Sequence, residues 1–121
     1  MRLVLRKSDS VADWYVIERD GVHGEPTLER RNGILQLIVP ARISDADVEG
    51  TLAEMRSLAL AIRERSEVQH KRCAVSVRAN GVVAFCSPRN SMTEGIVSLA
   101  EADDLATQIE ATAPDGARRE G

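Results

Sequence analysis

Apolar and polar residues alternate on both sides of two Asn-Gly pairs, Asn32-Gly33 and Asn80-Gly81. Asn-Gly accepts the positive φ angles of the two-residue turn that joins antiparallel strands, so each pair predicts a β-hairpin. Around the first turn the register pairs Arg31 with Ile34. It also places four residues of leucine or valine type on one face: Leu28, Leu35, Leu37 and Val39.

The second Asn-Gly pair predicts a hairpin in which Ala79 pairs with Val82 and Val75 with Cys86. On that register, small or apolar residues share the face that we expect to form the core: Cys73, Val75, Val77, Val82, Ala84 and Cys86. Two earlier strands are expected at residues 2–6 and 13–18, because each is a short apolar run between polar segments.

Two stretches have the apolar period of an amphipathic helix. The first is expected over residues 44–66, with Ser44 as N-cap and Asp47 three residues on, and its apolar stripe is Val48, Leu52, Met55, Ala59 and Ile62. The second is expected over residues 98–113, with Ser98 as N-cap, and its stripe is Leu99, Ala102, Leu105 or Ala106, and Ile109. It should end before Pro114, which cannot continue a helix.

These elements predict an α+β fold, in which an antiparallel sheet of β-hairpins carries two α-helices on one face as a two-layer sandwich. A chain of 121 residues with 43% hydrophobic residues can bury one core. We therefore expect a single domain over residues 1–113. Residues 114–121 contain no large apolar side chain, which predicts a flexible C-terminal tail.

The two Asn-Gly segments, RRNGILQL from Arg30 and RANGVVAF from Arg78, resemble each other and are 48 residues apart. Each is followed by Ile-Val, a short gap and the start of a predicted helix. One interpretation is an internal repeat of a hairpin-plus-helix unit. The other is that two unrelated hairpins share generic turn residues, and the generic chemistry of the turn favours it.

Charge gives no general attraction to nucleic acid or to anionic membranes, because 19 acidic residues outnumber 16 basic ones and both are dispersed. The N-terminal segment MRLVLRKSD has an apolar run of only three residues, and no cleavage site follows. It therefore predicts neither a secretory signal nor a membrane anchor. The expected location is the cytoplasm.

Four residues could in principle bind zinc: His23, His70, Cys73 and Cys86. Only His70 and Cys73 have a ligand-like spacing, however, and structural zinc sites bring close pairs on both sides. In the predicted register Cys73 and Cys86 are diagonal neighbours on the core face, too far apart for a disulfide. We expect two buried, reduced thiols and neither a metal nor another cofactor.

Paired carboxylates occur at Asp45 and Asp47 and at Asp103 and Asp104. Both pairs lie in the predicted first turns of helices, where carboxylates complement the helix dipole and need no tuned pKa. The sequence thus contains no constellation that predicts an enzyme.

The polar stretch Ser87–Thr93 is expected to be a loop, interrupted by Pro88. Its Ser, Arg and Asn side chains could hold a phosphate or carboxylate, but no glycine-rich cradle accompanies them. As an alternative to a plain connection, the loop could contact a protein partner, because Arg is frequent in interface anchors. The predicted partner-binding residues are Ser87, Arg89, Asn90, Ser91 and the aromatic residue Trp14.

Basic residues near the end of the first predicted helix form a second candidate site: Arg63, Arg65, Lys71 and Arg72. They could contact phosphates of a nucleic acid, although no helix-turn-helix spacing or base-stacking platform accompanies them. The competing explanation is that basic side chains in a last helical turn complement the helix dipole.

Three hypotheses of function follow. The first is a small non-catalytic interaction or regulatory protein, homodimeric through its sheet and binding a protein partner, such as an inhibitor or adaptor of the phage type. The composition, with its Ala- and Asp-rich end VSLAEADDLATQIEA, is similar to that of small proteins of high-GC bacteria and their phages. The second is nucleic-acid binding through the basic residues. The third is binding of a small anionic ligand through the segment 87–93.

Overall fold

A computed structural model of the chain describes residues 2–8, 12–18, 26–40, 45–88 and 90–112. For residues 2–4, 7, 14, 16–18 and 90–93 the structure describes the backbone only. The elements in chain order are β1 (Arg2–Ser8), β2 (Ala12–Glu18), β3 (Thr27–Arg31), β4 (Ile34–Val39), β5 (Ala46–Thr51), α1 (Leu52–Arg63), β6 (Val68–Gln69), β7 (Ala74–Val77), β8 (Val82–Ser87), β9 (Asn90–Ser98) and α2 (Leu99–Thr112).

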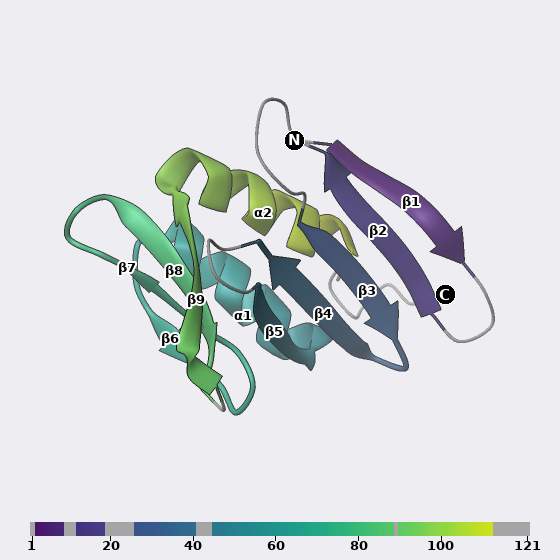
Figure 1. Cartoon of the computed structure of the whole chain (residues 1–121), viewed down its shortest axis with the longest axis horizontal. Helices are drawn as coiled ribbons and strands as arrows, with labels where there is room; N and C mark the ends of the chain where they lie inside the picture. The colour runs from purple at the N-terminus through teal and green to yellow at the C-terminus, as the bar shows by residue number, and fades with distance from the viewer. Residues whose placement is uncertain (1, 9–11, 19–25, 41–44, 89, 113–121) are drawn as a thin grey trace.

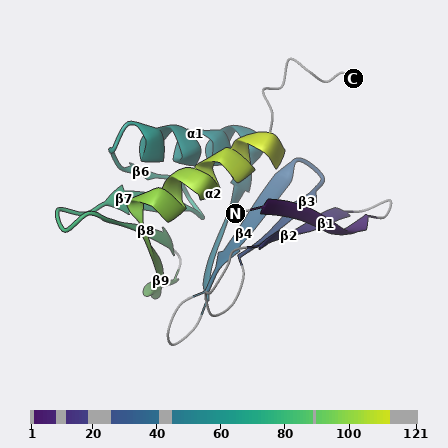
Figure 2. The same cartoon turned by 90° about the horizontal axis from the view of Figure 1, so that it is seen from above.

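The predicted α+β class is confirmed. The described strands form two antiparallel sheets instead of one, with strand orders β1-β2-β3-β4-β5 and β6-β7-β8-β9. Both helices pack on the same side of the two sheets (Figures 1 and 2). The predicted tail, residues 114–121, lies outside the described residues.

The first predicted hairpin is confirmed in register and in the face that it buries. Arg31 pairs with Ile34 and Leu28 with Leu37. Asn32 and Gly33 have φ angles of +49° and +78°, so both turn residues are in the left-handed region that Asn-Gly tolerates. The four residues of the predicted apolar face are fully buried: Leu28, Leu35, Leu37 and Val39.

The register predicted for the second hairpin is wrong by one residue. Only Gly81 has a positive φ, of +83°, and its N–H donates to the carbonyl of Arg78 at 3.0 Å. Ala79, Asn80 and Gly81 therefore form a three-residue loop, which is the other common way to close a hairpin around a glycine.

This shift exchanges the two faces of β8, because side chains alternate along a strand. Val75 pairs with Phe85 and Val77 with Val83, and these residues line the core. Cys86 pairs with Ala74 on the opposite face and is only half-buried. The prediction that both thiols face the core thus holds for Cys73 and fails for Cys86.

The first helix begins at Leu52, eight residues later than predicted, and Ser44 is not its N-cap. Residues 46–51 instead alternate strictly between buried and non-buried positions and pair with β4 as a strand. Gly50 is a weak helix former, and pairing on β4 outweighs the remaining helical preference. Thr51 is the N-cap: its Oγ1 accepts from the Glu54 N–H at 3.1 Å, while Glu54 Oε1 accepts from the Thr51 N–H at 2.9 Å.

The second helix agrees with its prediction. It extends from Leu99 to Thr112, and the Glu101 N–H donates to the Ser98 hydroxyl at 3.2 Å. Of the predicted stripe, Ala102, Leu105, Ala106 and Ile109 are fully buried and Leu99 is half-buried against the core. At the other end of the helix, the Arg30 guanidinium donates to the carbonyl of Thr112 at 3.0 Å and ties α2 to β3.

The two halves of the structure share one order of elements, which supports the internal-repeat interpretation. The first unit is β3-β4-β5-α1 and the second is β7-β8-β9-α2. In both, the third strand leads directly into a helix whose N-cap carries a hydroxyl, within the sequences TLAE from Thr51 and SLAE from Ser98. The helices of the two units pack against each other above a shared core.

Candidate interaction surface

One side of the five-stranded sheet faces away from both helices (Figure 2). Because side chains alternate along a strand, the residues between the buried ones of β3, β4 and β5 point to this side. We call it the open face, and its described side chains are Thr27, Glu29, Arg31, Ile34, Gln36, Ile38, Asp47, Glu49 and Thr51. The opposite side carries the core residues of the same strands.

The open face combines apolar and hydrogen-bonded polar residues. Ile34 retains 36% of its accessible surface and Ile38 is half-buried. Between them, the Gln36 amide donates to the Asp47 carboxylate at 2.8 and 3.0 Å, and Arg31 is paired with Glu29. One exposed and one half-buried isoleucine, beside polar groups that are already hydrogen-bonded within the sheet, give this face an apolar area that another protein could cover.

The sequence-predicted contact residue Trp14 belongs to the same sheet. On β2 it pairs with Glu29 of β3, which in turn pairs with Gln36 of β4. Its position in the register therefore lies in the same row across the strands as these two residues of the open face. Asp47 and Glu49 were missed as members of this surface, because the sequence was interpreted as helical from residue 44. The signal that could have placed them is the alternation of Ala46, Val48 and Gly50 with polar residues.

The segment Ser87–Thr93, predicted as a loop, is mostly strand. β8 ends at Ser87 and β9 begins at Asn90, and these two residues pair with each other. Arg89 and the side chains of Asn90, Ser91 and Thr93 lie outside the described part of the structure. Trp14 and this β8–β9 hairpin are on different sheets (Figure 1), so the predicted contact residues do not form one cluster.

Three of the four residues of the predicted basic site are engaged with carboxylates. Arg63 donates to Glu110 at 2.8 Å, and Arg65 donates to both oxygens of Asp103 at 2.8 and 3.0 Å. The hydrogen bond from Arg65 lowers the pKa of Asp103.

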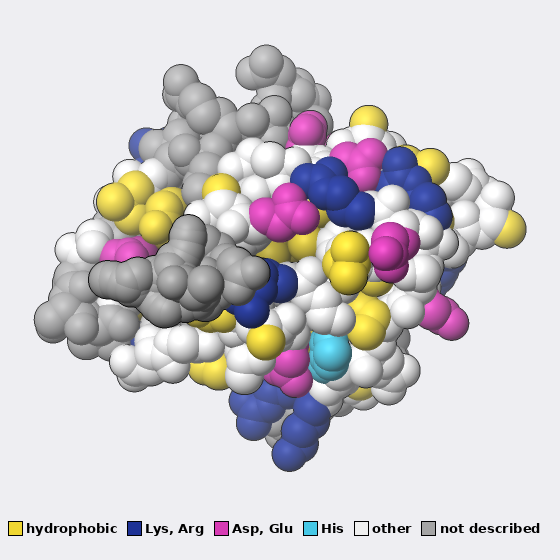
Figure 3. Space-filling model, turned by 180° about the vertical axis from the view of Figure 1, so that it is seen from behind, with side chains coloured by type: hydrophobic (Ala, Val, Ile, Leu, Met, Phe, Trp, Pro, Cys, Tyr) yellow, Lys and Arg dark blue, Asp and Glu magenta, His cyan; other side chains and the backbone are white. Residues whose placement is uncertain are grey.

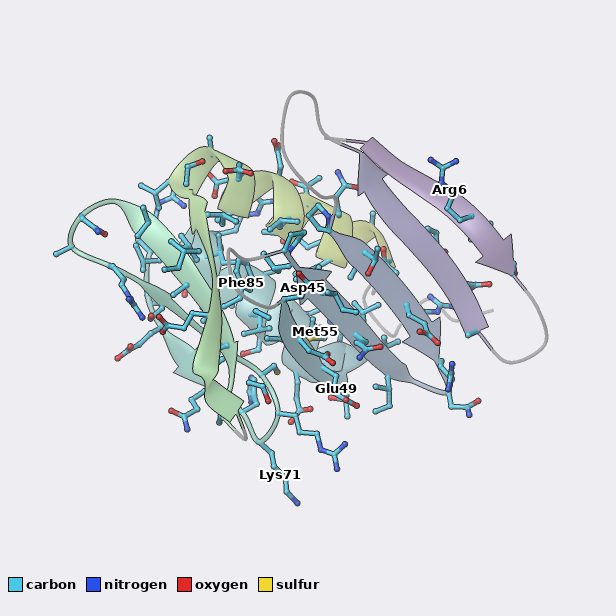
Figure 4. All side chains as sticks on the ribbon, viewed as in Figure 1. Arg6, Asp45, Glu49, Met55, Lys71 and Phe85 are labelled. Carbon is cyan, nitrogen blue, oxygen red and sulfur yellow. The ribbon has the colours of Figure 1, made fainter. Side chains whose placement is uncertain are left out.

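Arg72 lies 3.6 Å from Glu49, and the Lys71 side chain points away from the protein (Figure 4). On the helical side of the molecule basic and acidic groups are interspersed (Figure 3). Such a mixed surface gives little attraction to a polyanion and does not favour the binding of nucleic acid.

Cys73 is fully buried, and its environment keeps it a neutral thiol. Burial, aided by the carboxylates of Glu54 and Glu49, raises the pKa of Cys73 to about 12. The thiolate is the reactive form, so this group is no nucleophile at neutral pH. His70 approaches Glu54 with its Nδ1 at 4.0 Å, and its backbone N–H donates to the carbonyl of Cys73 at 2.7 Å.

Cys86 is also a free thiol, and burial is the main cause that raises its pKa. It lies on the opposite face of its sheet from Cys73, so the two cannot form a disulfide without a change of register. His23 lies outside the described residues. Within the part of the chain that the structure describes, no three His, Cys, Asp or Glu side chains are grouped closely enough to hold a metal ion.

Comparisons of the chain with protein-family models, with curated proteins and with solved structures gave no match. Neither described helix has the length and apolar character needed to cross a membrane. The open face is therefore the candidate site for binding another protein.

Proposed function

We propose that the chain is a non-catalytic interaction protein that binds another protein through the open face of its five-stranded sheet. The observation that carries the proposal is that Ile34 is exposed and Ile38 half-buried on a sheet face to which neither helix contributes. Apolar residues on a sheet usually face a core, and apolar residues that reach the surface are stabilised when a partner buries them.

The chemistry of the cysteines supports a binding role over a catalytic one. Both free thiols have a raised pKa, and Cys73 is fully buried as a neutral thiol. In the proposal the protein acts in the cytoplasm, where free thiols remain reduced, as an inhibitor or adaptor. The tip of the β8–β9 hairpin, with Ser87, Arg89, Asn90 and Ser91, remains a predicted second contact.

An affinity capture with matched variants tests the proposal. Tagged full-length chain is used as bait in extracts of source cells that also express an untagged copy. The variant Ile38→Lys places a charge on the open face, and the control Leu60→Lys places the same charge on the exposed outer side of α1, where Leu60 retains 55% of its surface. Thermal melting first verifies that both variants are folded.

We expect the wild-type chain and Leu60→Lys to retain a common protein that Ile38→Lys loses, because a buried unpaired charge opposes association. The proposal is overturned if all three baits retain the same proteins, or if none retains any.

A further inference from the structure

The two edge strands of the five-stranded sheet carry charges of opposite sign, and the strands between them carry charges of both signs. β1 contains Arg2, Arg6 and Lys7 and no acidic residue. β5 and the residue before it contain Asp45, Asp47 and Glu49 and no basic residue. Figure 4 shows Arg6 and the two labelled acids, Asp45 and Glu49, at opposite edges of the sheet.

Within one copy these edges do not neutralise each other. Four strand spacings separate β1 from β5, which is about 19 Å. That distance exceeds the Debye length of about 8 Å at physiological salt. The β1 edge therefore carries basic residues and the β5 edge acidic ones, with Glu18 opposite Arg2 in register and Arg72 3.6 Å from Glu49.

From this pattern we infer that the open face binds a second copy of the same chain, with β1 of each copy opposite β5 of the other. The inference rests on the proposed function and specifies its partner. In two-fold symmetric dimers each contact occurs twice, so one complementary pair of edges is satisfied at both ends of the interface.

The geometry of the sheet allows two simple face-to-face arrangements. A two-fold axis that runs along the middle strand, β3, places β1 over the partner's β5. An axis across the strands would instead place β1 over β1 and β5 over β5. Like charges that face each other across an interface oppose binding, so the charge pattern selects the axis along β3.

The residues along that axis are compatible with self-contact. On β3, Glu29 and Arg31 form an ion pair within the copy, so two such strands meet without net repulsion. The same axis places β4, with Ile34 and Ile38, over the partner's β2, where Trp14 occupies the register position opposite Glu29. Aromatic and aliphatic residues are the usual anchors at the centre of such interfaces.

A charge exchange between the two edges tests the arrangement. One variant, Arg6→Glu with Lys7→Glu, makes the β1 edge acidic. The other, Asp45→Lys with Asp47→Lys, makes the β5 edge basic and leaves Glu49 in contact with Arg72. The control, Glu64→Lys with Glu67→Lys, changes net charge as much as the β5 variant, at exposed positions that follow α1.

Sedimentation equilibrium of the full-length chains measures the dimer dissociation constant up to millimolar concentration. Each edge variant alone should dimerise at least tenfold more weakly than the wild type, because both of its edges then have the same sign. An equimolar mixture of the two edge variants should recover the wild-type constant to within about threefold, since every acidic edge again meets a basic one. The control pair should stay within about threefold of the wild type.

Two results would overturn the inference while leaving the proposed function to the capture experiment. A wild-type chain that remains monomeric throughout would remove the second copy as the partner. A wild-type dimer on which the edge variants act no more strongly than the control would remove the arrangement of β1 over β5.

Discussion

The two strand-strand-strand-helix units of this protein contain the same dipeptide at the same place and use it differently. In the first unit Asn32 and Gly33 both have positive φ and form the whole loop. In the second, only Gly81 has positive φ, and Asn80 is one of three loop residues. One additional residue reverses the faces of the neighbouring strand, so the length of the loop decides which side chains reach the core.

The units also differ in how closely their third strands approach the rest of the core. In the first unit Leu37 of β4 pairs with Val48 of β5. In the second unit Phe85 of β8, at the corresponding place, pairs with Gly95 of β9. A Cβ at Gly95 would lie 2.7 Å from the Cβ of Val39 and 3.0 Å from that of Ala46, both in the first unit. The glycine thus allows the second sheet to pack on the first, and the two units differ at this contact.

The largest effect is expected at this glycine. Gly95→Ala should lower the free energy of unfolding by about 3 kcal/mol, because its new methyl group meets buried residues that have no room to move. The comparison in the first unit is Gly50→Ala, on its third strand, which should cost about 1 kcal/mol. There the nearest atoms are Oε1 and Cβ of Glu54, at 2.9 and 3.0 Å, and Sγ of Cys73, at 3.1 Å, and the closest of them is the end of a flexible side chain. Urea denaturation measures both values, and equal losses would contradict this difference between the units.

Local signals were sufficient to predict the first hairpin and the second helix. The Asn32-Gly33 turn has a two-residue loop, so counting outward from it gives the observed register. Ser98 caps its helix within four residues of sequence, and Pro114 follows the helix end. In both elements the deciding interactions lie between near neighbours in the chain, which a sequence pattern can represent.

Two other assignments depended on interactions that the local pattern does not contain. Residues 46–51 have apolar positions compatible with either period, and their pairing with β4 makes them a strand. The loop at Asn80 could have two or three residues, and only packing of Phe85 in the core distinguishes them. For the candidate surface, Trp14 was predicted from the scarcity of aromatic residues, whereas Asp47 and Glu49 were assigned to a helix.

The two asparagines should respond differently to the same substitution. Asn32→Ala should lower the free energy of unfolding by about 1 kcal/mol, because alanine tolerates a positive φ less well than asparagine does. Asn80→Ala should change it by less than about 0.5 kcal/mol, since the positive φ of that loop falls on Gly81. Chemical denaturation of the two variants under identical conditions compares them directly. An equal cost at both positions would mean that both loops use a left-handed asparagine.

The smallest effect on stability is expected from the ion pair between Arg65, which follows α1, and Asp103 of α2. Its contribution can be separated from others by its dependence on pH. The hydrogen bond from Arg65 is the main cause that lowers the pKa of Asp103 in the folded protein. A carboxyl whose folded pKa is depressed stabilises the fold above its unfolded value, about 3.9, and loses that contribution as the pH falls through the folded value.

Asp103→Asn should therefore lower the melting temperature slightly at pH 7, and the difference from the wild type should shrink below pH 4 as the wild-type carboxyl is protonated. Both partners are partly exposed, so screening keeps the effect below that of either comparison above. Asp45→Asn is the control, because Asp45 precedes β5 and is remote from the helix contact. Melting curves from pH 7 to pH 2.5 measure the difference. If Asp103→Asn and the control differ from the wild type by the same amount at every pH, this ion pair does not hold the two units together, and their cohesion depends on the apolar core and on other contacts such as that of Arg63 with Glu110.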